Sequence, residues 1–536
     1  MSEKGTGMAD EQYPAWIRAL LDPRRYPQPV DRVEVVETHI SWVLLAGDHA
    51  YKFKKPVDFG FVDFTTLDRR RYYCREELRR NQPLAGELYE TVIAVCGSSE
   101  RPTLHEDGEE TGEAFEYGVR MLRFDSTDQL DHRLAAGRVT GTEMGDFARR
   151  LALFHADAAR VDPQSEWGTP AAVVGPAREN IRQLESLLER QPELAPRLAS
   201  TLRKVAEWTE RTGARLEPIF AGRRADGFVR ECHGDLHLGN LVRHHGRVIA
   251  FDCIEFNPDF YWIDTINELA FLVMDTSDRG HPGLGRHILN RYLEWSGDYD
   301  GVPVLDFYRV YRAMVRAKVT GLRARQMQTH DTGATATEIG GYLDLAERMM
   351  APRDTWLAIT HGLSGSGKSR VSGELIEAGD AIRLRSDVER KRLYGLTPDD
   401  SSDSGVAAGI YTPEAGQRTY DRLLDQARRL LDAGWPVIVD AAFLTREQRE
   451  PFLTLARERG IAGVILDITA PEAVLHERVR ARSQRRDDAS EADENVLERQ
   501  IGLREPVTAD EAERVVTVDT TRTHDPTTLW ARVTGH

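Results

Sequence analysis

Apolar and polar positions alternate with a period of two in the first folded stretch of the chain. Between Val33 and Phe64, β-branched and aromatic residues alternate with polar ones, a pattern that predicts short antiparallel strands. Residues 67–84 carry a helical pattern, and residues 91–96 and 113–124 are again strand-like, with a polar turn between them at 105–110. These patterns predict a small sheet accompanied by one helix.

The period then changes to that of a helix. Residues 142–217 have apolar positions three and four apart, which predicts a mostly helical region. At 227–256 this helical pattern gives way to short strands around a loop rich in His, Asp and Asn. Helices resume until Pro352 stops them. Beyond it, residues 356–376 read as strand, glycine loop and helix, and 435–443 and 462–468 as buried strands between helices. This alternation predicts a parallel sheet.

Length and composition divide the chain and narrow its class. At 536 residues the chain exceeds what one hydrophobic core usually supports, so we predict an N-terminal arm at 1–30 and domains at 31–351 and 355–536. A net charge of −16 repels phosphate backbones, so nucleic acid is not an expected partner. Four scattered cysteines, no secretory signal and no apolar run of membrane-spanning length predict a cytoplasmic protein without membrane contact.

The most specific motif is the stretch Gly362-Leu-Ser-Gly-Ser-Gly-Lys-Ser369, which follows a strand and precedes a helix. It matches G-x-x-x-x-G-K-[ST], in which backbone amides and the helix N-terminus hold phosphates, the lysine reaches the β and γ phosphates and the last hydroxyl binds Mg²⁺. The motif predicts ATP and Mg²⁺ as cofactors. The predicted nucleotide-binding residues are Gly362, Ser364, Gly365, Ser366, Gly367, Lys368 and Ser369, with Lys368 also catalytic.

Acidic and basic residues after this loop supply the remaining parts of a phosphotransfer site. Asp387 follows a short strand and has Arg390 one helical turn later, a pair suited to a general base and a substrate cation, although an N-cap Asp with a surface Arg is an equally good interpretation. Asp440 ends a buried strand, as a magnesium-ordering carboxylate does. An arginine-rich run follows, with Arg478, Arg482, Arg485 and Arg486. We predict that it forms a lid in which Arg482 binds the nucleotide; the alternative is a solvated helix face.

A second cluster of polar side chains lies in the loop at 232–240. Asp235 and Asn240 are five residues apart, and Asp252 ends the following strand. A carboxylate base with two oxygen ligands for Mg²⁺ suits phosphoryl transfer. A metal hydrolase that uses His233 and His237 is the competing interpretation, but it needs more histidine ligands than this loop supplies.

Both clusters resemble known families. The H-G-D-x-x-x-x-N element with its strand-terminal Asp252 resembles the aminoglycoside phosphotransferase and choline kinase superfamily, which has the protein-kinase fold. That resemblance implies Asp235 as catalytic base and Asn240 and Asp252 as metal ligands. It also implies an N-lobe lysine held by a helix glutamate, for which we choose Lys52 and Glu77 over the neighbouring Lys54 and Glu76.

The last third of the chain resembles a P-loop kinase group that includes polynucleotide kinases, zeta toxins, gluconate kinases and chloramphenicol phosphotransferase. The residues that carry this resemblance are the glycine loop, Ser386-Asp387-Val-Glu-Arg390, the strand ending at Asp440 and the spaced lid arginines. It implies Asp387 as general base, Arg390 as substrate-binding residue and an AAA-type ATP-binding domain.

The predicted fold is multidomain: a protein-kinase-like α+β region, with a small β-rich N-lobe and a helical C-lobe, precedes a P-loop α/β domain with a parallel sheet. The predicted function is a bifunctional kinase that transfers the γ-phosphate of ATP to hydroxyl groups of small molecules. Two alternatives stay open: one half regulates the other by binding ATP, or the P-loop half phosphorylates 5′-hydroxyl ends of nucleic acid. The sequence predicts neither the acceptors nor the oligomeric state.

Overall fold

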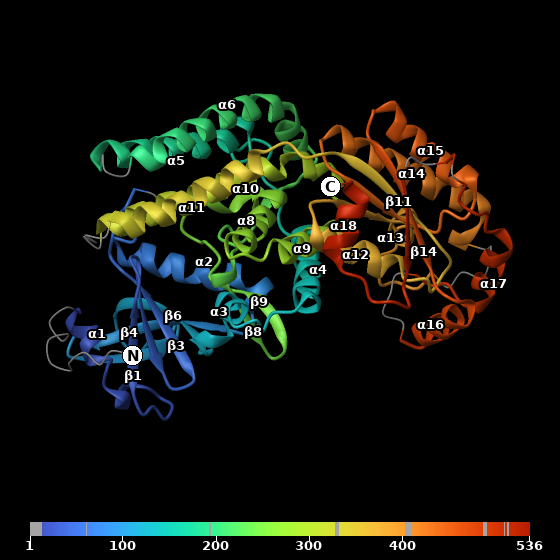
Figure 1. Cartoon of the computed structure of the whole chain (residues 1–536). Coiled ribbons are helices and arrows are strands. Elements are labelled where there is room, and N and C mark those ends of the chain that lie inside the picture. Colours follow the sequence, from blue (N-terminus) through green and yellow to red (C-terminus); the bar gives the residue numbers. More distant parts are fainter. Residues whose placement is uncertain are drawn as a thin grey trace. The chain divides into compact units, whose positions relative to one another are not determined.

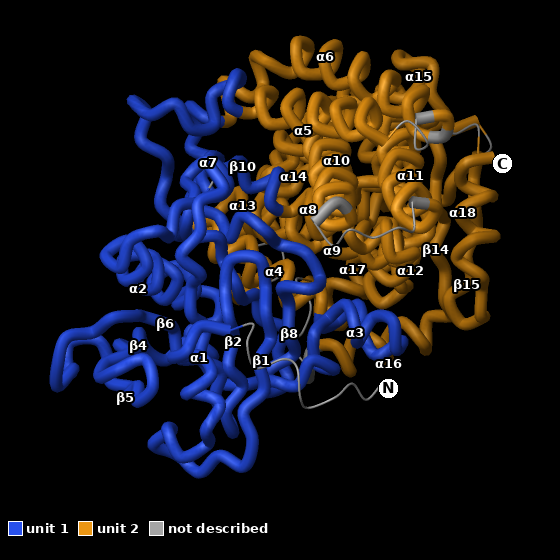
Figure 2. Tube along the Cα trace, turned by 90° about the vertical axis from the view of Figure 1, so that its left-hand side faces the viewer, with its two compact units in different colours: residues 1–143, 157–172, 224–268 blue, residues 144–156, 173–223, 269–536 orange. Residues whose placement is uncertain are grey.

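The computed structural model describes residues 13–60, 62–191, 195–326, 332–402, 409–485, 490–508, 510–511 and 514–535. These residues form two compact units, shown in different colours in Figure 2. The first contains residues 1–143, 157–172 and 224–268, and the second contains 144–156, 173–223 and 269–536. This division cuts through the segment predicted as the first domain, so the bounds 31–351 and 355–536 stay a prediction.

The first unit contains a six-stranded antiparallel sheet in the order β1-β2-β3-β6-β4-β5. Its strands are β1 (Val33–Glu37), β2 (Ser41–Ala46), β3 (His49–Lys54), β4 (Tyr89–Ser98), β5 (Arg101–Glu106) and β6 (Ala114–Leu122). Helix α2 (Leu67–Ala85) packs against β4 and β6 (Figure 1). Strand β5 was not predicted, because its residues overlap the polar stretch expected as a turn.

Part of the predicted N-terminal arm belongs to the core of this unit. Helix α1 (Ala15–Ala19) and the turn η1 (Pro23–Arg25) bring Trp16, Ile17 and Tyr26 against the sheet residues Trp42 and Phe53. Trp16 meets Phe53 edge to face, with ring centroids 5.1 Å apart. Residues 13–30 therefore stabilise the sheet by burying aromatic area.

The remaining elements of the first unit surround the loop at 232–240. They are η2 (Ser126–Asp128), α3 (Leu130–Ala135), β7 (Val229–Glu231), η3 (Leu238–Asn240), β8 (Leu241–His244), β9 (Arg247–Ala250), α7 (Pro258–Tyr261) and β10 (Trp262–Asp264). Strand β10 pairs antiparallel with β7, and β9 pairs antiparallel with β8. The loop is thus anchored on both sides by short paired strands.

Helices dominate the chain on both sides of the polar loop at 232–240, as the periodicity predicts. They are α4 (Gly141–Asp157), α5 (Pro170–Arg190), α6 (Ala195–Ala225), α8 (Thr265–Asp278), α9 (Pro282–Ser296), η4 (Tyr299–Gly301), α10 (Val302–Gln326) and α11 (Thr332–Met350). In the second unit, α5, α6, α10 and α11 share a core that includes Leu184, Leu202, Met314 and Leu343.

A five-stranded parallel sheet in the order β12-β13-β11-β14-β15 forms the rest of the second unit. The strands are β11 (Trp356–His361), β12 (Ile382–Arg385), β13 (Val437–Asp440), β14 (Ala462–Thr469) and β15 (Arg514–Asp519), and the other elements are α12 (Lys368–Ala378), α13 (Ser386–Leu393), η5 (Gly409–Tyr411), α14 (Pro413–Asp432), α15 (Arg446–Glu458), α16 (Glu472–Arg485), α17 (Glu494–Leu503) and α18 (Pro526–Thr534). Helices α12 and α18 bury Leu375 and Leu529 against one face of this sheet.

The fold class predicted from the sequence is confirmed: a protein-kinase-like α+β region precedes a P-loop α/β region with a parallel sheet. Within the described part of the chain, no helix combines the length and the apolar character that crossing a membrane requires.

Candidate active sites

The glycine loop lies between strand β11 and helix α12. Gly365 and Gly367 have φ angles of +81° and +97°, in the left-handed region that residues with a Cβ rarely adopt. A Cβ on Gly365 would also lie 2.8 Å from the carbonyl oxygen of Leu475. The loop carbonyl of Ser366 accepts a hydrogen bond from the Thr520 hydroxyl at 2.7 Å. Local sequence and a contact from the end of β15 thus shape the loop together.

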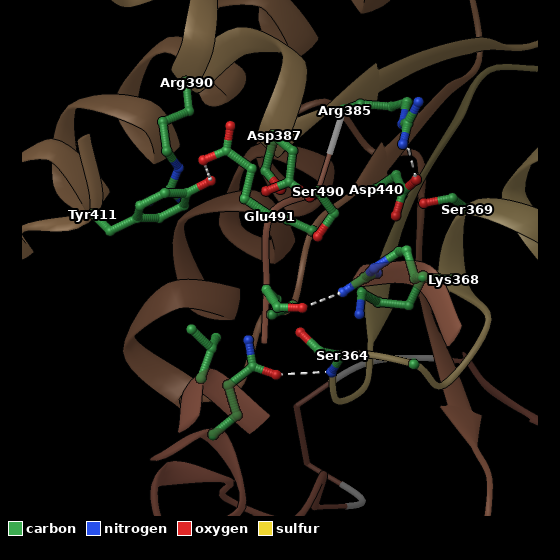
Figure 3. Close-up of a pocket in the computed structure, with 18 of the residues that line it drawn as sticks. Ser364, Lys368, Ser369, Arg385, Asp387, Arg390, Tyr411, Asp440, Ser490 and Glu491 are labelled. Carbon is green, nitrogen blue, oxygen red and sulfur yellow. Dashed lines mark hydrogen bonds and ion pairs between the residues drawn. The ribbon is translucent and has the colours of Figure 1, made fainter. Parts of the chain in front are cut away.

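A pocket of about 580 Å³ opens in front of this loop (Figure 3). Most of the residues predicted for the P-loop site line it: Ser364, Gly365, Gly367, Lys368, Ser369, Asp387, Arg390, Asp440 and Arg482. Gly362 and Ser366 belong to the same loop but are not among the lining residues. The ammonium group of Lys368 donates to the carbonyl oxygens of Gly362 and Leu363 at 3.0 and 2.9 Å. The structure therefore brings residues from four separate stretches of sequence to one cavity.

One hydroxyl group and one carboxylate group in this pocket suit a magnesium ion. Ser369 lies in the first turn of α12, and Asp440 is the last residue of β13 and is buried. Figure 3 shows their side chains at the same wall of the pocket. The Ser372 hydroxyl donates to Asp440 at 3.3 Å, and Arg385 Nε lies 3.7 Å from the same carboxylate. Hard oxygen donors beside a phosphate-binding loop are the set that Mg²⁺ prefers.

Asp387 and Arg390 both lie in the short helix α13, which begins directly after β12. The Arg390 guanidinium stacks 5.1 Å from the ring centre of Tyr411 and donates a long hydrogen bond to the Ile410 carbonyl at 3.4 Å. Burial, together with the nearby charges of Asp387 and Glu491, raises the pKa of Tyr411 well above its usual value. Tyr411 therefore stays protonated and donates to Glu491 at 3.3 Å.

The lid arginines have different partners. Arg478 donates to the carbonyl of Gly365 at 3.2 Å and to Thr520 at 2.8 Å, which fixes it against the loop. Arg482 donates to the carbonyl of Ala492 at 2.9 Å and lines the pocket. The side chain of Arg485 and the whole of Arg486 lie outside the described residues.

Sequence reasoning missed several residues of this pocket. They are Arg385, Tyr411, Glu491 and Gln500, the last of which accepts a hydrogen bond from the Ser364 amide at 2.7 Å. Arg385 directly precedes the Ser386-Asp387 element, and this position in the sequence could have identified it as a residue of the site. The other three come from helices and loops that carry no recognisable motif.

The second candidate site lies in the first unit. Lys52 on β3 forms ion pairs with Glu77 on α2 at 2.7 Å and with Asp252 at 2.5 Å. Burial by itself would lower the pKa of Lys52, but the charges of Asp252 and Glu77 raise it well above its usual value. Glu76, the alternative to Glu77, instead pairs with Arg79 at 2.8 Å. The structure therefore brings together the lysine, glutamate and aspartate chosen from the sequence.

Lys54, the alternative to Lys52, belongs to the same buried cluster. It donates to the other oxygen of Glu77 at 2.6 Å and to Glu255, a residue the sequence interpretation missed. Glu77 has no exposed surface. Despite that burial, the charges of Lys52 and Lys54 lower the pKa of Glu77, which stays ionised. Glu77 thus links the slightly exposed Lys52 to the fully buried Lys54.

Asp235 and Asn240 are held together across their loop. The Asn240 amide nitrogen donates to both the backbone oxygen and the Oδ2 of Asp235, each at 3.0 Å. These two bonds use the Asn240 amide nitrogen and not its amide oxygen. Asp252 has a φ of +65°, which is strained for a residue with a side chain, and its side chain is 46% exposed. The donor set of Asn240 and Asp252 fits Mg²⁺.

A buried carboxylate holds the backbone of this loop. Glu268 accepts hydrogen bonds from the amides of His233 at 2.9 Å and Gly234 at 2.7 Å. Sequence reasoning missed Glu268, which lies 33 residues beyond Asp235 in helix α8 and has no motif around it.

The arrangement of His233 does not favour the metal hydrolase interpretation. Its ring is buried, Nε2 donates to the carbonyl of Phe251 at 2.8 Å, and Nδ1 accepts from the Asp235 amide at 3.3 Å. Burial lowers the pKa of His233, so the ring is neutral and both nitrogens are used. His237 accepts from the Gly239 amide at 3.1 Å. His233 therefore braces the loop instead of binding a metal.

Comparison with known proteins identifies both regions. Residues 101–309 match the family described as "Phosphotransferase enzyme family", and residues 357–507 match the "AAA domain" family. An uncharacterized protein of Mycobacterium tuberculosis is 29% identical over 461 residues, which cover 85% of this chain and 88% of that protein.

Two solved structures are similar to separate parts of the chain. A choline kinase from Cryptosporidium parvum covers 62% of this chain and 96% of its own, with 10% identity and a TM-score of 0.39. A gluconokinase from Sinorhizobium meliloti covers 34% and 91%, with 21% identity and a TM-score of 0.24. These matches confirm the resemblances drawn from the motifs: an earlier region of the chain matches the phosphotransferase enzyme family and a later region matches the AAA domain family. Together they support phosphotransferase activity in general terms.

Proposed function

We propose that the chain is an ATP-dependent kinase with two nucleotide sites, each transferring the γ-phosphate of ATP to a hydroxyl group of a small molecule. We assign one site to residues 31–351 and the other to residues 355–536. The observation that carries the proposal is the single pocket of about 580 Å³ that Lys368, Ser369, Asp387 and Asp440 line together. A phosphate-binding loop, two oxygen ligands and a carboxylate base are the parts that phosphoryl transfer needs.

In the P-loop site, the loop amides and Lys368 would hold the phosphates. Ser369 and Asp440 would hold Mg²⁺, which neutralises charge on the phosphates when bound. Asp387, in the first turn of α13, would accept the proton of the acceptor hydroxyl, and Arg390 and Arg482 would bind anionic groups of the acceptor or the transferred phosphoryl group.

In the other site, Lys52 would bind the ATP phosphates and Glu77 would orient it, as their 2.7 Å ion pair supports. Asn240 and Asp252 would hold Mg²⁺. Asp235 would act as the base, with its carboxylate oriented by the Asn240 amide at 3.0 Å. Neither arrangement selects among small acceptors, so the acceptor class is tested directly.

The test is incubation of the purified full chain with Mg-ATP and a pool of hydroxyl-bearing metabolites and aminoglycosides, with new phosphorylated species followed by mass spectrometry. Asp235→Asn and Lys368→Ala are the informative variants. Loss of a general base costs about 10²- to 10⁴-fold in rate. Lys204→Ala is the matched control, because this lysine is exposed and forms an ion pair at 2.5 Å with Glu347, which is also exposed.

Two product sets, each lost with a different variant, would support two independent kinases. Loss of the same product in both variants would indicate that the two sites act together in one reaction. If one variant loses all chemistry while nucleotide still binds at the other site, that other site is regulatory. Phosphorylation of a 5′-hydroxyl oligonucleotide would change the acceptor assigned to the P-loop half from small molecules to nucleic-acid ends. The absence of any phosphorylated product would overturn the proposal.

A further inference from the structure

Helix α9 packs against elements of the P-loop region, although it lies in the segment that matches the phosphotransferase enzyme family. Its residues, Pro282–Ser296, fall within the stretch 101–309 that matches the phosphotransferase enzyme family. Both α9 and the parallel sheet belong to the second compact unit. Helix α9 packs against α12, the helix that begins at Lys368, and against strand β12.

Asn290 of α9 occupies the place of a neighbouring strand along β12. Strand β12 is at the edge of the parallel sheet, so none of the strands that the structure describes pairs with one side of its backbone. The Asn290 side chain accepts a hydrogen bond from the amide of Arg383 at 2.7 Å and donates to the carbonyl of Ala381 at 3.2 Å. These bonds fix the position of β12 relative to α9.

One helical turn later, Glu294 places a buried carboxylate behind the same strand. It pairs with Arg383 at 2.6 Å, with Arg385 at 3.7 Å and with Arg291 of its own helix at 2.6 Å. Burial by itself would raise the pKa of Glu294, but the charges of these arginines lower it to about 2. Glu294 is therefore ionised at neutral pH.

Each of the two strand arginines leads from Glu294 to one of the proposed magnesium ligands. Arg383 donates to the backbone oxygen of Ser369 at 3.0 Å and to the Ser372 hydroxyl at 3.3 Å. Arg385 lies 3.7 Å from the Asp440 carboxylate, and Figure 3 shows this contact at the wall of the pocket. Arg385 is thus shared between Glu294 on one side and Asp440 on the other.

We propose that Glu294 is a positioning residue of the P-loop site: by holding Arg383 and Arg385, it keeps Ser369 in place and leaves the Asp440 carboxylate available to Mg²⁺. This inference rests on the proposed magnesium role of Ser369 and Asp440. Without the Glu294 charge, less attraction holds the Arg385 guanidinium away from Asp440, so Arg385 competes with the metal for the Asp440 carboxylate. A residue of the phosphotransferase-family segment is then part of the P-loop site.

The test measures Mg²⁺-dependent binding of a fluorescent ADP analogue to the full chain, with the P-loop component defined as the part that Lys368→Ala removes. Loss of a group that orients a metal ligand typically costs 10- to 100-fold in metal affinity. Glu294→Gln should therefore raise the Mg²⁺ concentration for half-maximal binding at least about tenfold. The double variant Glu294→Gln/Arg385→Gln should return it to near the wild-type value, because the competing cation is gone.

Glu377→Gln is the matched control. It removes a negative charge from a contact between the same two helices, since Glu377 of α12 pairs with His287 of α9 at 2.8 Å. Glu377 is 49% exposed, and within the described part of the chain it forms no hydrogen bond or ion pair with Arg383 or Arg385. Its Mg²⁺ requirement should stay within about twofold of the wild type, as expected for an exposed pair.

A folded Glu294→Gln variant with the Mg²⁺ requirement of the wild type would overturn the inference. A double variant whose Mg²⁺ requirement is as high as that of Glu294→Gln would also overturn it, because the defect would then come from a loss of structure. If Glu294→Gln does not fold, Glu294→Asp decides, because it keeps the charge but is one methylene shorter: a raised requirement supports the inference and an unchanged one overturns it. A wild-type chain with no binding component removed by Lys368→Ala would instead refute the proposed P-loop function itself.

Discussion

The buried charge cluster around Glu77 gives a sharp prediction for Glu77→Gln. Glu77 accepts hydrogen bonds from Lys52 at 2.7 Å and Lys54 at 2.6 Å and has no exposed surface. A glutamine keeps one acceptor oxygen, but its amide nitrogen only donates hydrogen bonds, so one ammonium group loses its partner on α2. Each lysine keeps one other carboxylate, Asp252 or Glu255.

Breaking a buried ion pair by removing one partner costs about 3–5 kcal/mol. Because both lysines keep a carboxylate, we expect the low end of this range, about 3 kcal/mol of unfolding free energy for the first unit. Glu76→Gln is the control one residue earlier. It removes a partly exposed pair with Arg79, whose side chain is 51% exposed, and should cost less than about 1 kcal/mol.

Hydrogen exchange followed by mass spectrometry measures this difference without requiring the whole chain to unfold as one unit. Slowly exchanging amides of β3 and α2 should exchange about a hundredfold faster in Glu77→Gln, since each 1.4 kcal/mol is a factor of ten. In Glu76→Gln the increase should stay below about fivefold. Equal exchange rates in the two variants would refute the role of Glu77 as the centre of the cluster.

Two further predictions concern buried groups elsewhere. Burial lowers the pKa of His233 below its ordinary value of 6.5. Below that pH the unfolded chain binds a proton that the folded chain does not, so the free energy of unfolding falls as the pH falls. In urea titrations between about pH 6.5 and 5, the free energy of unfolding of His233→Gln should therefore fall less steeply with decreasing pH than that of the wild type, and an identical dependence on pH would contradict this linkage. Arg449 is fully buried and pairs with Glu511 at 2.6 Å, so Arg449→Met should cost about 3–5 kcal/mol in thermal unfolding. Arg446→Met, which removes an exposed pair with Asp510, should cost less than about 1 kcal/mol, and similar melting temperatures for the two would contradict the argument.

Local sequence was sufficient where one continuous stretch contains the whole feature. The glycine loop needs left-handed backbone at Gly365 and Gly367 and a helix that begins at Lys368, and all of these conditions are met within eight consecutive residues. The pairing of Asp235 with Asn240 across a short loop is local in the same sense. The alternation of strands and helices likewise predicted both sheets and the order of the two regions.

Periodicity left undecided the choices that depend on a partner distant in sequence. Lys52 and Lys54 share one face of β3, so alternation cannot rank them, and the structure shows that Glu77 contacts both. Strand β5 escaped prediction because its residues are polar and its place in the sheet comes from pairing with β4. Secondary-structure patterns report which face of an element is buried, but not what lies against that face.

Short stretches of sequence therefore encode the chemistry of each motif, namely the phosphate loop and the carboxylates at strand ends, and also the kinase-like order of elements. Which side chains come into contact depends on the packing of elements that are distant in the chain. Glu294 lies 91 residues before Arg385, in a helix without any motif, and yet its carboxylate lies 3.7 Å from that guanidinium. Contacts of this kind arise when packed helices and strands exclude water around paired charges, and no local pattern of residues encodes them.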